Sequence, residues 1–144
     1  LVDIWHFALS EMLRAGTLND EVGVALSKVQ VSAQTDPGAF RLAIEALASS
    51  SLQTRSFEMR PFIEAMRTLP MDYEELYGLY IGKNVLNQFR QNNGYQSGTY
   101  RKLWHGREDN EHLVEVLGEF SGNPASLPER LYQALEARYT ADAG

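Results

Sequence analysis

The sequence contains no cysteine, which excludes disulfide bonds and thiolate metal sites. A bound metal ion would have to be held by carboxylates, carbonyl oxygens or histidine, and this ligand chemistry favours Mg²⁺, with Mn²⁺ as the alternative. The lack of cysteine also suits a reducing compartment, so we expect a cytoplasmic protein.

Long apolar runs and an excess of basic residues are also missing. No apolar run approaches the length of a membrane-spanning helix, and the start shows no signal-peptide pattern. Lysine and arginine number 13 against 19 aspartate and glutamate, which gives a net charge of −6. We therefore expect no membrane partner and no binding to duplex nucleic acid.

Alternating β-branched segments are missing too, and amphipathic helical patterns fill the chain instead. The three serines at 49–51 are expected to form a loop or link between two of the helices. We predict an all-α fold, an antiparallel helical bundle in a single domain of residues 1–144. The predicted helices cover residues 1–14, 20–33, 37–48, 56–69, 72–93, 108–120 and 126–139.

The stretch at 83–110, KNVLNQFRQNNGYQSGTYRKLWHGREDN, contains the densest set of candidate binding groups. Lys83, Asn87 and Arg90 have the spacing of one helical face, opposite an apolar stripe that includes Leu86 and Phe89. Asparagine and glycine at 92–94 predict the end of this helix. A glycine-containing loop with tyrosines, further cations and Trp104 follows. The bland alternative is a solvated basic face beside aromatic residues that pack down onto the core.

The first helix, LVDIWHFALSEMLR, also has two faces. Trp5, Ala8, Leu9 and Met12 form its core stripe, and Asp3 and Phe7 share the other side. A carboxylate one turn from an aromatic ring could hold a metal while the ring stacks on a nucleobase. From the residues alone, a solvated aspartate and a packed phenylalanine are the simpler interpretation, and His6 has the pattern of a hydrogen-bonded core histidine.

These two stretches, VDIWHFALSEML and IGKNVLNQFRQNNGYQSGTYRKLWHGREDN, resemble the dimeric all-α dUTP diphosphatases. That family belongs to the MazG-like nucleoside triphosphate pyrophosphohydrolases. The resemblance implies hydrolysis of dUTP to dUMP and pyrophosphate by a homodimer. Between the two stretches, residues 15–70 resemble the family only in being helical.

The resemblance also implies roles for individual residues. In the family, carboxylates in an ExxE and an ExxD motif on two helices bind Mg²⁺, and Asp3 matches the aspartate of the second motif. Asp3 is thus the candidate metal-binding and catalytic residue. The candidates for binding the base or nucleoside are His6, Phe7, Asn84 and Asn110. The candidates for binding phosphate are Lys83, Asn87, Arg90, Tyr95, Tyr100 and Lys102.

The remaining carboxylates of the family's motifs would lie before Leu1. The sequence opens inside a helical pattern without a cap, so we expect these residues to be the C-terminal two-thirds of a longer chain. We also expect residues 1–144 by themselves to hydrolyse dUTP negligibly. Removal of Arg90 is expected to lower activity with little effect on stability, since both interpretations leave it outside the core.

Three alternative functions stay open. A related all-α pyrophosphohydrolase could act on dCTP or another nucleoside triphosphate, because a carboxamide pairs with uracil or cytosine by reversing its donor and acceptor. A non-enzymatic module could bind a nucleotide or a single strand by stacking bases on Tyr95, Tyr100 and Trp104. The third alternative is a purely structural helical bundle.

Overall fold

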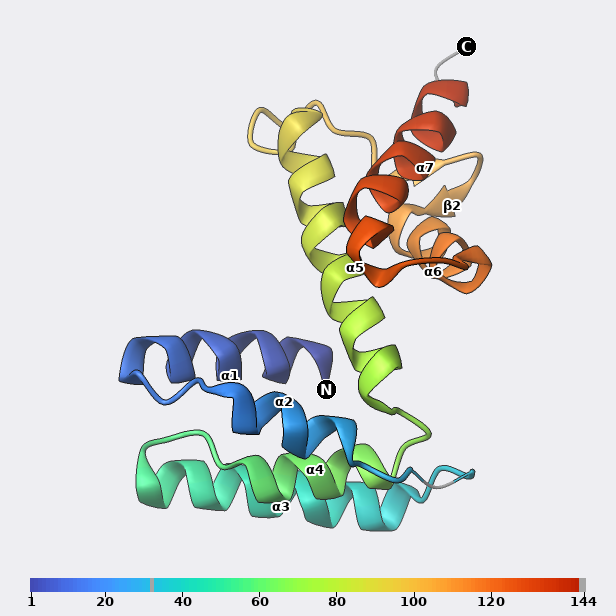
Figure 1. The fold of residues 1–144 in the computed structure, drawn as a ribbon. Helices are drawn as coiled ribbons and strands as arrows, with labels where there is room; N and C mark the ends of the chain where they lie inside the picture. The colour runs from blue at the N-terminus through green and yellow to red at the C-terminus, as the bar shows by residue number, and fades with distance from the viewer. Residues whose placement is uncertain (32, 143–144) are drawn as a thin grey trace. The chain divides into compact units, whose positions relative to one another are not determined.

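The computed structural model describes residues 1–31 and 33–142 and confirms the all-α fold. The chain forms two compact units, Leu1–Tyr77 and a second unit that begins at Gly78. Figure 1 shows the helices of each unit and the short hairpin of the second. Among the described residues, no helix is both long and apolar enough to cross a bilayer.

The first unit is built from helices packed on an aromatic centre. Trp5 stacks on Phe62 with ring centroids 5.3 Å apart, and Phe57 meets both rings edge-on. Phe62 is fully buried, so this cluster ties the first helix of the unit to the fourth. The helices of the unit are α1 (Val2–Ala15), α2 (Asp20–Ser27), α3 (Pro37–Thr54) and α4 (Met59–Arg67).

The predicted loop at residues 49–51 is wrong, because α3 continues through the serines to Thr54. Serine and threonine hydroxyls within a helix can bond back to a carbonyl of the preceding turn. The Ser50 hydroxyl donates to the Leu47 carbonyl at 3.0 Å, and the Thr54 hydroxyl donates to the Ser50 carbonyl at 2.9 Å. The residue after the helix, Arg55, is its C-cap and has a left-handed conformation with a φ of 54°.

The long helix that the sequence predicted over 72–93 is α5 (Tyr73–Asn92). Its residues up to Tyr77 belong to the first unit, and those from Gly78 belong to the second. Its buried side in the second unit includes Val85, Leu86 and Phe89. The later elements are β1 (Leu103–Trp104), β2 (Arg107–Glu108), α6 (Asp109–Glu119), the short 3₁₀ helix η1 (Pro124–Ser126) and α7 (Leu127–Ala141).

The hairpin of β1 and β2 is an element that the sequence did not predict. Leu103 pairs with Glu108, and Trp104 pairs with Arg107. The two turn residues have positive φ, 49° at His105 and 76° at Gly106, as a tight hairpin turn requires. Strands of two residues are too short to produce an alternating pattern, so nothing in the hydrophobic periodicity could reveal them.

Trp104 forms the centre of the core of the second unit. It is fully buried, and its indole N–H donates to the Arg101 carbonyl at 2.7 Å. Phe89 and Tyr139 meet its ring edge-on at centroid distances of 5.6 Å and 5.2 Å, and His112 stacks on it at 5.1 Å. The alternative interpretation of the loop aromatics as packing residues is therefore correct for Trp104.

Candidate functional site

Asp3 and Phe7 share the face of the first helix opposite the core stripe, as the sequence predicted, but Phe7 is exposed to solvent and not packed as the simpler interpretation had it. Trp5, Ala8 and Met12 are buried on the opposite side. Phe7 is 77% exposed, and Asp3 is also exposed one turn earlier. The carboxylate and the ring therefore lie on a helical face that the core of the unit does not use.

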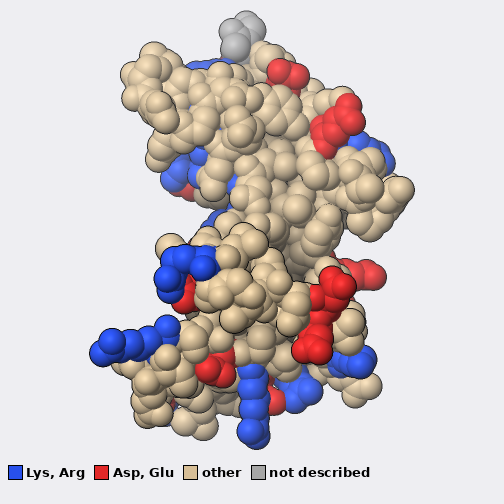
Figure 2. Space-filling model, turned by 60° about the vertical axis from the view of Figure 1, so that its left-hand side comes forward, with Lys and Arg blue, Asp and Glu red and all other residues tan. Residues whose placement is uncertain are grey.

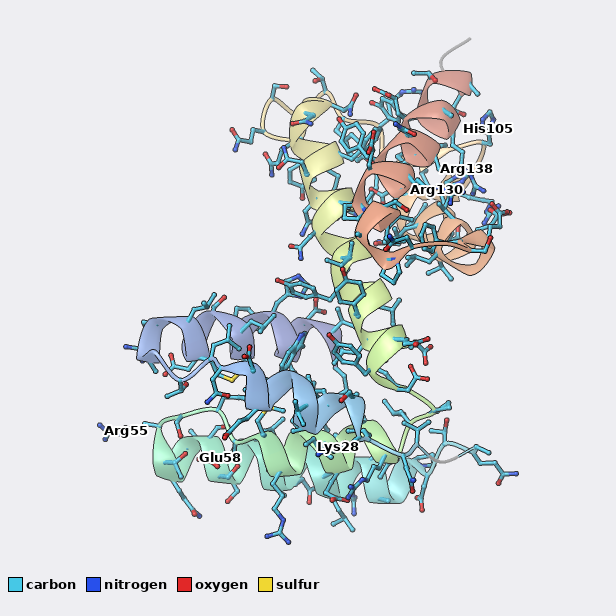
Figure 3. All side chains as sticks on the ribbon, viewed as in Figure 1. Lys28, Arg55, Glu58, His105, Arg130 and Arg138 are labelled. Carbon is cyan, nitrogen blue, oxygen red and sulfur yellow. The ribbon has the colours of Figure 1, made fainter. Side chains whose placement is uncertain are left out.

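A groove of about 470 Å³ lies beside Phe7 within the first unit. Ile4, Phe57 and Leu47 contribute apolar surface to it, and Glu11 and Arg55 contribute charged side chains. Figure 3 shows Arg55 at the end of α3 with its side chain extended outward. The volume lies within the range of small-molecule sites, which bind flat rings through apolar walls.

His6 is half-buried on the same helix. Its Nδ1 lies 3.0 Å from the Val2 carbonyl oxygen, one turn back in α1. This contact is the hydrogen-bonded state that the sequence pattern predicted as the simpler interpretation.

On α5, Lys83, Asn87 and Arg90 have the spacing of one helical side, which adjoins the buried stripe at Arg90. Asn87 is exposed, whereas Lys83 and Arg90 are half-buried. Asn84 is exposed as well, and its amide donates to the Tyr80 carbonyl at 3.2 Å. The helix thus carries two cations and a carboxamide with the spacing of one side, and the two cations are partly buried.

Arg90 forms a buried ion pair that the sequence did not predict. Its Nε donates to Oδ2 of Asp109 and its Nη2 to Oδ1, each at 2.8 Å. The Asp109 side chain is completely buried, and that of Arg90 is 19% exposed. The Tyr100 hydroxyl also donates to Asp109 Oδ2, at 2.8 Å. Arg90 is therefore mostly buried and paired with a buried carboxylate, which contradicts the interpretation that placed it outside the core and predicted little effect of its removal on stability.

The pKa values of these groups follow from that geometry. Burial acts to raise the pKa of Asp109, but the hydrogen bonds from Arg90 and Tyr100 outweigh it and leave this pKa below its ordinary 3.8. Burial is the main cause of a raised pKa of the Tyr100 hydroxyl, and the hydrogen bond to Asp109 raises this pKa further. The bond to Asp109 raises the pKa of Arg90. Asp109 thus stays ionised, and Tyr100 stays a hydrogen-bond donor at neutral pH.

A glycine cap turns the chain out of α5 and into the loop of residues 93–102. The Tyr95 amide donates to the Arg90 carbonyl at 3.0 Å, and the Gly94 amide donates to the Gln91 carbonyl at 3.4 Å, the Schellman pattern. Gly94 has a φ of 89°, and a Cβ there would lie 2.1 Å from the Thr99 hydroxyl oxygen. The predicted helix end is confirmed, and it requires glycine.

The other predicted phosphate groups lie along this loop and the hairpin. Tyr95 is 56% exposed. Lys102 is also exposed, with its Nζ 3.2 Å from Glu108 Oε2. Asn110 is exposed in the first turn of α6. Figure 2 shows Lys and Arg side chains interspersed with Asp and Glu side chains over the face in view.

This geometry disfavours the single-strand binding module. Trp104 is completely buried, and Tyr100 is half-buried with its ring stacked on Tyr139 at a centroid distance of 5.6 Å. Base stacking requires an accessible ring face. Of the three aromatic residues proposed for stacking, only Tyr95 is well exposed.

Comparison with known protein families decides among the remaining functions. A family model described as dUTPase matches residues 1–95, well over half of the chain. The chain belongs to the dUTPase family. A search of curated proteins found no match.

Membership makes the chain a dUTP diphosphatase, a hydrolase of nucleotide metabolism, as the sequence resemblance implied. The match includes Asp3, Phe7, Lys83 and Arg90, and it ends at Tyr95. The later candidate residues of the dUTPase, including Tyr100 and Lys102, lie beyond the matched range.

The dUTPases use a divalent metal ion, and residues 1–31 and 33–142 do not form a complete site for one. These residues contain no group of three or more histidine, cysteine, aspartate or glutamate side chains placed to hold a metal. Asp3 is an exposed carboxylate suited to one position in such a site. Further oxygen ligands would have to join Asp3 before a metal ion could be held there.

Asp109 is the structural residue of the dUTPase that sequence reasoning missed. An aspartate in an acidic stretch, REDNE, has the pattern of a solvated helix start. Asp109 is the first residue of α6, whose N-cap is Glu108, so the Asp109 side chain is not needed as the cap. A buried aspartate has no sequence signature of its own, and only the cation nineteen residues earlier could have suggested a partner.

Proposed function

We propose that this dUTPase cleaves dUTP to dUMP and pyrophosphate with Mg²⁺, as a homodimer, and that the predicted site residues bind the substrate. The observation that carries the proposal is the exposure of Asp3 and Phe7 on one face of α1, opposite the core stripe. A carboxylate and an exposed aromatic ring, one turn apart, supply a hard metal ligand and a stacking surface.

The nucleoside would lie against Phe7. The adjoining groove of about 470 Å³ can accept a base, and its apolar lining favours a flat ring. His6, Asn84 and Asn110 are the proposed polar partners of the base and sugar. An asparagine amide can pair with the N3–H and O4 edge of uracil, which fixes the orientation of the ring.

The phosphate chain would lie against the polar face of α5 and its loop. Nucleoside triphosphates carry several negative charges, and charge-assisted bonds from lysine and arginine stabilise phosphate most strongly. The proposed contacts are Lys83, Asn87, Arg90, Tyr95, Tyr100 and Lys102. Mg²⁺ is proposed because carboxylate oxygens and substrate phosphates are its usual ligands, and Mn²⁺ could substitute.

The test is a substrate panel with the full-length protein, combined with one variant on α1. dUTP should be cleaved in preference to dCTP and dTTP, with pyrophosphate as product and with dependence on added Mg²⁺. Phe7→Ala should weaken dUTP binding by about 5- to 150-fold, since base–aromatic stacking contributes ~1–3 kcal/mol per base. Stability should not fall, because the ring is 77% exposed.

Leu13→Ala provides the matched control, since Leu13 is another large apolar side chain on α1 and is 66% exposed. Its removal should leave KM for dUTP unchanged. Equal effects of the two substitutions, or faster cleavage of dCTP than of dUTP, would contradict the proposal.

A further inference from the structure

The carboxylate of Asp109 lies at the junction of three elements of the second unit. Asp109 is the first residue of α6. Its carboxylate accepts two hydrogen bonds from Arg90 of α5 and another from Tyr100 of the loop 93–102. Its backbone N–H also donates to the Lys102 carbonyl at 3.0 Å. One residue thus fixes the positions of two proposed phosphate ligands by their side chains and of a third by its backbone.

The bond pattern on Arg90 leaves part of the guanidinium available. Asp109 takes the edge formed by Nε and Nη2. Nη1 faces Asn87 of the same helical face, with a long contact of 3.4 Å to Oδ1. A guanidinium has five N–H groups, so the same side chain can bond a carboxylate on one edge and a phosphate on the other.

We propose that Asp109 is a positioning residue of this site, holding Arg90 and the loop 93–102 in the arrangement that accepts the phosphate chain. The phosphate role rests on the function proposed above. Asp109 does not touch substrate in this arrangement, because its side chain is completely buried and its oxygens are taken by Arg90 and Tyr100.

Whether removal of the Asp109 charge weakens or tightens nucleotide binding distinguishes a positioning role from a purely electrostatic effect. Asp109 is a negative charge close to a site for a polyanion, so Coulomb repulsion alone predicts tighter binding when that charge is removed. A positioning residue predicts weaker binding, because Arg90 loses one bonded edge and the loop loses its anchor.

The experiment measures the affinity of the full-length protein for α,β-imido-dUTP, a non-hydrolysable analogue, by calorimetry, in the wild type and in Asp109→Asn. Hydrogen exchange of the amides at 95–102 is followed in the same preparations. We expect Asp109→Asn to weaken binding about 10-fold or more, the effect of losing a charge-assisted contact. Exchange over 95–102 should become faster, while the middle of α7 stays protected.

Glu115→Gln is the matched control for net charge. Glu115 is a carboxylate of the same unit that pairs with Arg107 and Arg138 at the surface, and it has no contact with Arg90 among the described bonds. Arg138, which is labelled in Figure 3, comes from α7. Its substitution should leave affinity unchanged or slightly tighter.

Tyr100→Phe keeps the proposal testable if Asp109→Asn fails to fold. This variant retains the Arg90–Asp109 ion pair and removes only the hydroxyl bond from the loop to Asp109. Faster exchange at 95–102 would support the proposal and unchanged exchange would overturn it, because weaker binding alone also follows from the loss of Tyr100 as a proposed phosphate ligand. Unchanged or tighter binding in a folded Asp109→Asn protein, or in Tyr100→Phe where the former does not fold, would overturn it.

Failure of the proposed function gives a different result. A wild-type protein that does not bind the analogue contradicts the phosphate site itself, and with it the phosphate role of Asp109. The exchange measurement does not depend on nucleotide. Unchanged exchange at 95–102 in Asp109→Asn would overturn the positioning of the loop even if the wild type binds dUTP well.

Discussion

On α1, Asp3 and Phe7 are exposed on a regular helix, whereas two candidate phosphate groups of the second unit, Arg90 and Tyr100, are hydrogen-bonded to the buried Asp109. Phe7 is 77% exposed, and Asp109, which holds Arg90, is completely buried. The two regions therefore couple function to stability in different ways. The exposed side chains of Asp3 and Phe7 can be changed without disturbing the core, while changes around Arg90 alter both the site and the packing of its unit.

The largest expected effect lies on α1, where activity should change without stability. Asp3→Asn in the full-length enzyme should lower metal-dependent dUTP hydrolysis by more than about 100-fold, since even residues behind the metal ligands contribute ~10- to 100-fold. The helix content should stay at the wild-type level, because Asp3 is exposed. Steady-state kinetics at saturating Mg²⁺ and far-ultraviolet circular dichroism measure the two quantities.

Glu45→Gln is the control, since Glu45 is an exposed carboxylate in another helix of the same unit. It should change neither quantity. Wild-type turnover of Asp3→Asn at saturating Mg²⁺ would remove Asp3 from the proposed site.

Arg90 should show the opposite behaviour, a joint loss of stability and activity. Arg90→Ala leaves the buried Asp109 carboxylate without its cation, which costs about 3–5 kcal/mol for a buried pair. The lost phosphate contact should lower kcat/KM for dUTP by a further 10- to 150-fold, from about 1.5–3 kcal/mol. Urea unfolding and kinetics on one preparation, at a temperature where the variant is folded, measure both effects.

Arg41→Ala is the matched control for stability. Arg41 pairs with Glu45 at 3.6 Å on the surface of α3, where both side chains are more than half exposed. Exposed pairs contribute only about 0–1 kcal/mol. If Arg90→Ala costs no more than Arg41→Ala, the ion pair with Asp109 does not stabilise the unit, and the contrast between the two regions fails.

The contrast also explains what the sequence could reveal. The two faces of α1 and the glycine cap after α5 were predictable because periodicity and the left-handed glycine are local properties. The partners of Arg90 were not, because Asp109 and Tyr100 reach it through a loop and a hairpin without a periodic pattern. The helix through residues 49–51 was missed because serine is favoured in loops, whereas here the Ser50 and Thr54 hydroxyls bond to carbonyls of the previous turn and the helix continues.

The smallest expected effect is a pH dependence specific to the Arg90 region. The pKa of Asp109 lies below its ordinary 3.8 in the folded protein, so its ion pair stabilises the fold fully above that value. As the pH falls below 3.8, the unfolded state takes up a proton that the folded state does not yet bind, and this contribution to stability is lost. The loss has a slope of at most about 1.4 kcal/mol per pH unit for one group.

The double variant Arg90→Met/Asp109→Leu isolates this term. Replacing a buried ion pair by apolar side chains is often neutral for stability, so the variant should fold while lacking the titrating pair. Surface carboxylates with lowered pKa values, such as Glu115, are common to both proteins and cancel in the difference. The free energy of unfolding of the wild type minus that of the variant should be constant from pH 5 to pH 7 and should decrease below the ordinary pKa of 3.8. Parallel stability curves for the two proteins through the acid range would mean that Asp109 is not held ionised by Arg90, and the structural difference between the two regions would then have no energetic counterpart.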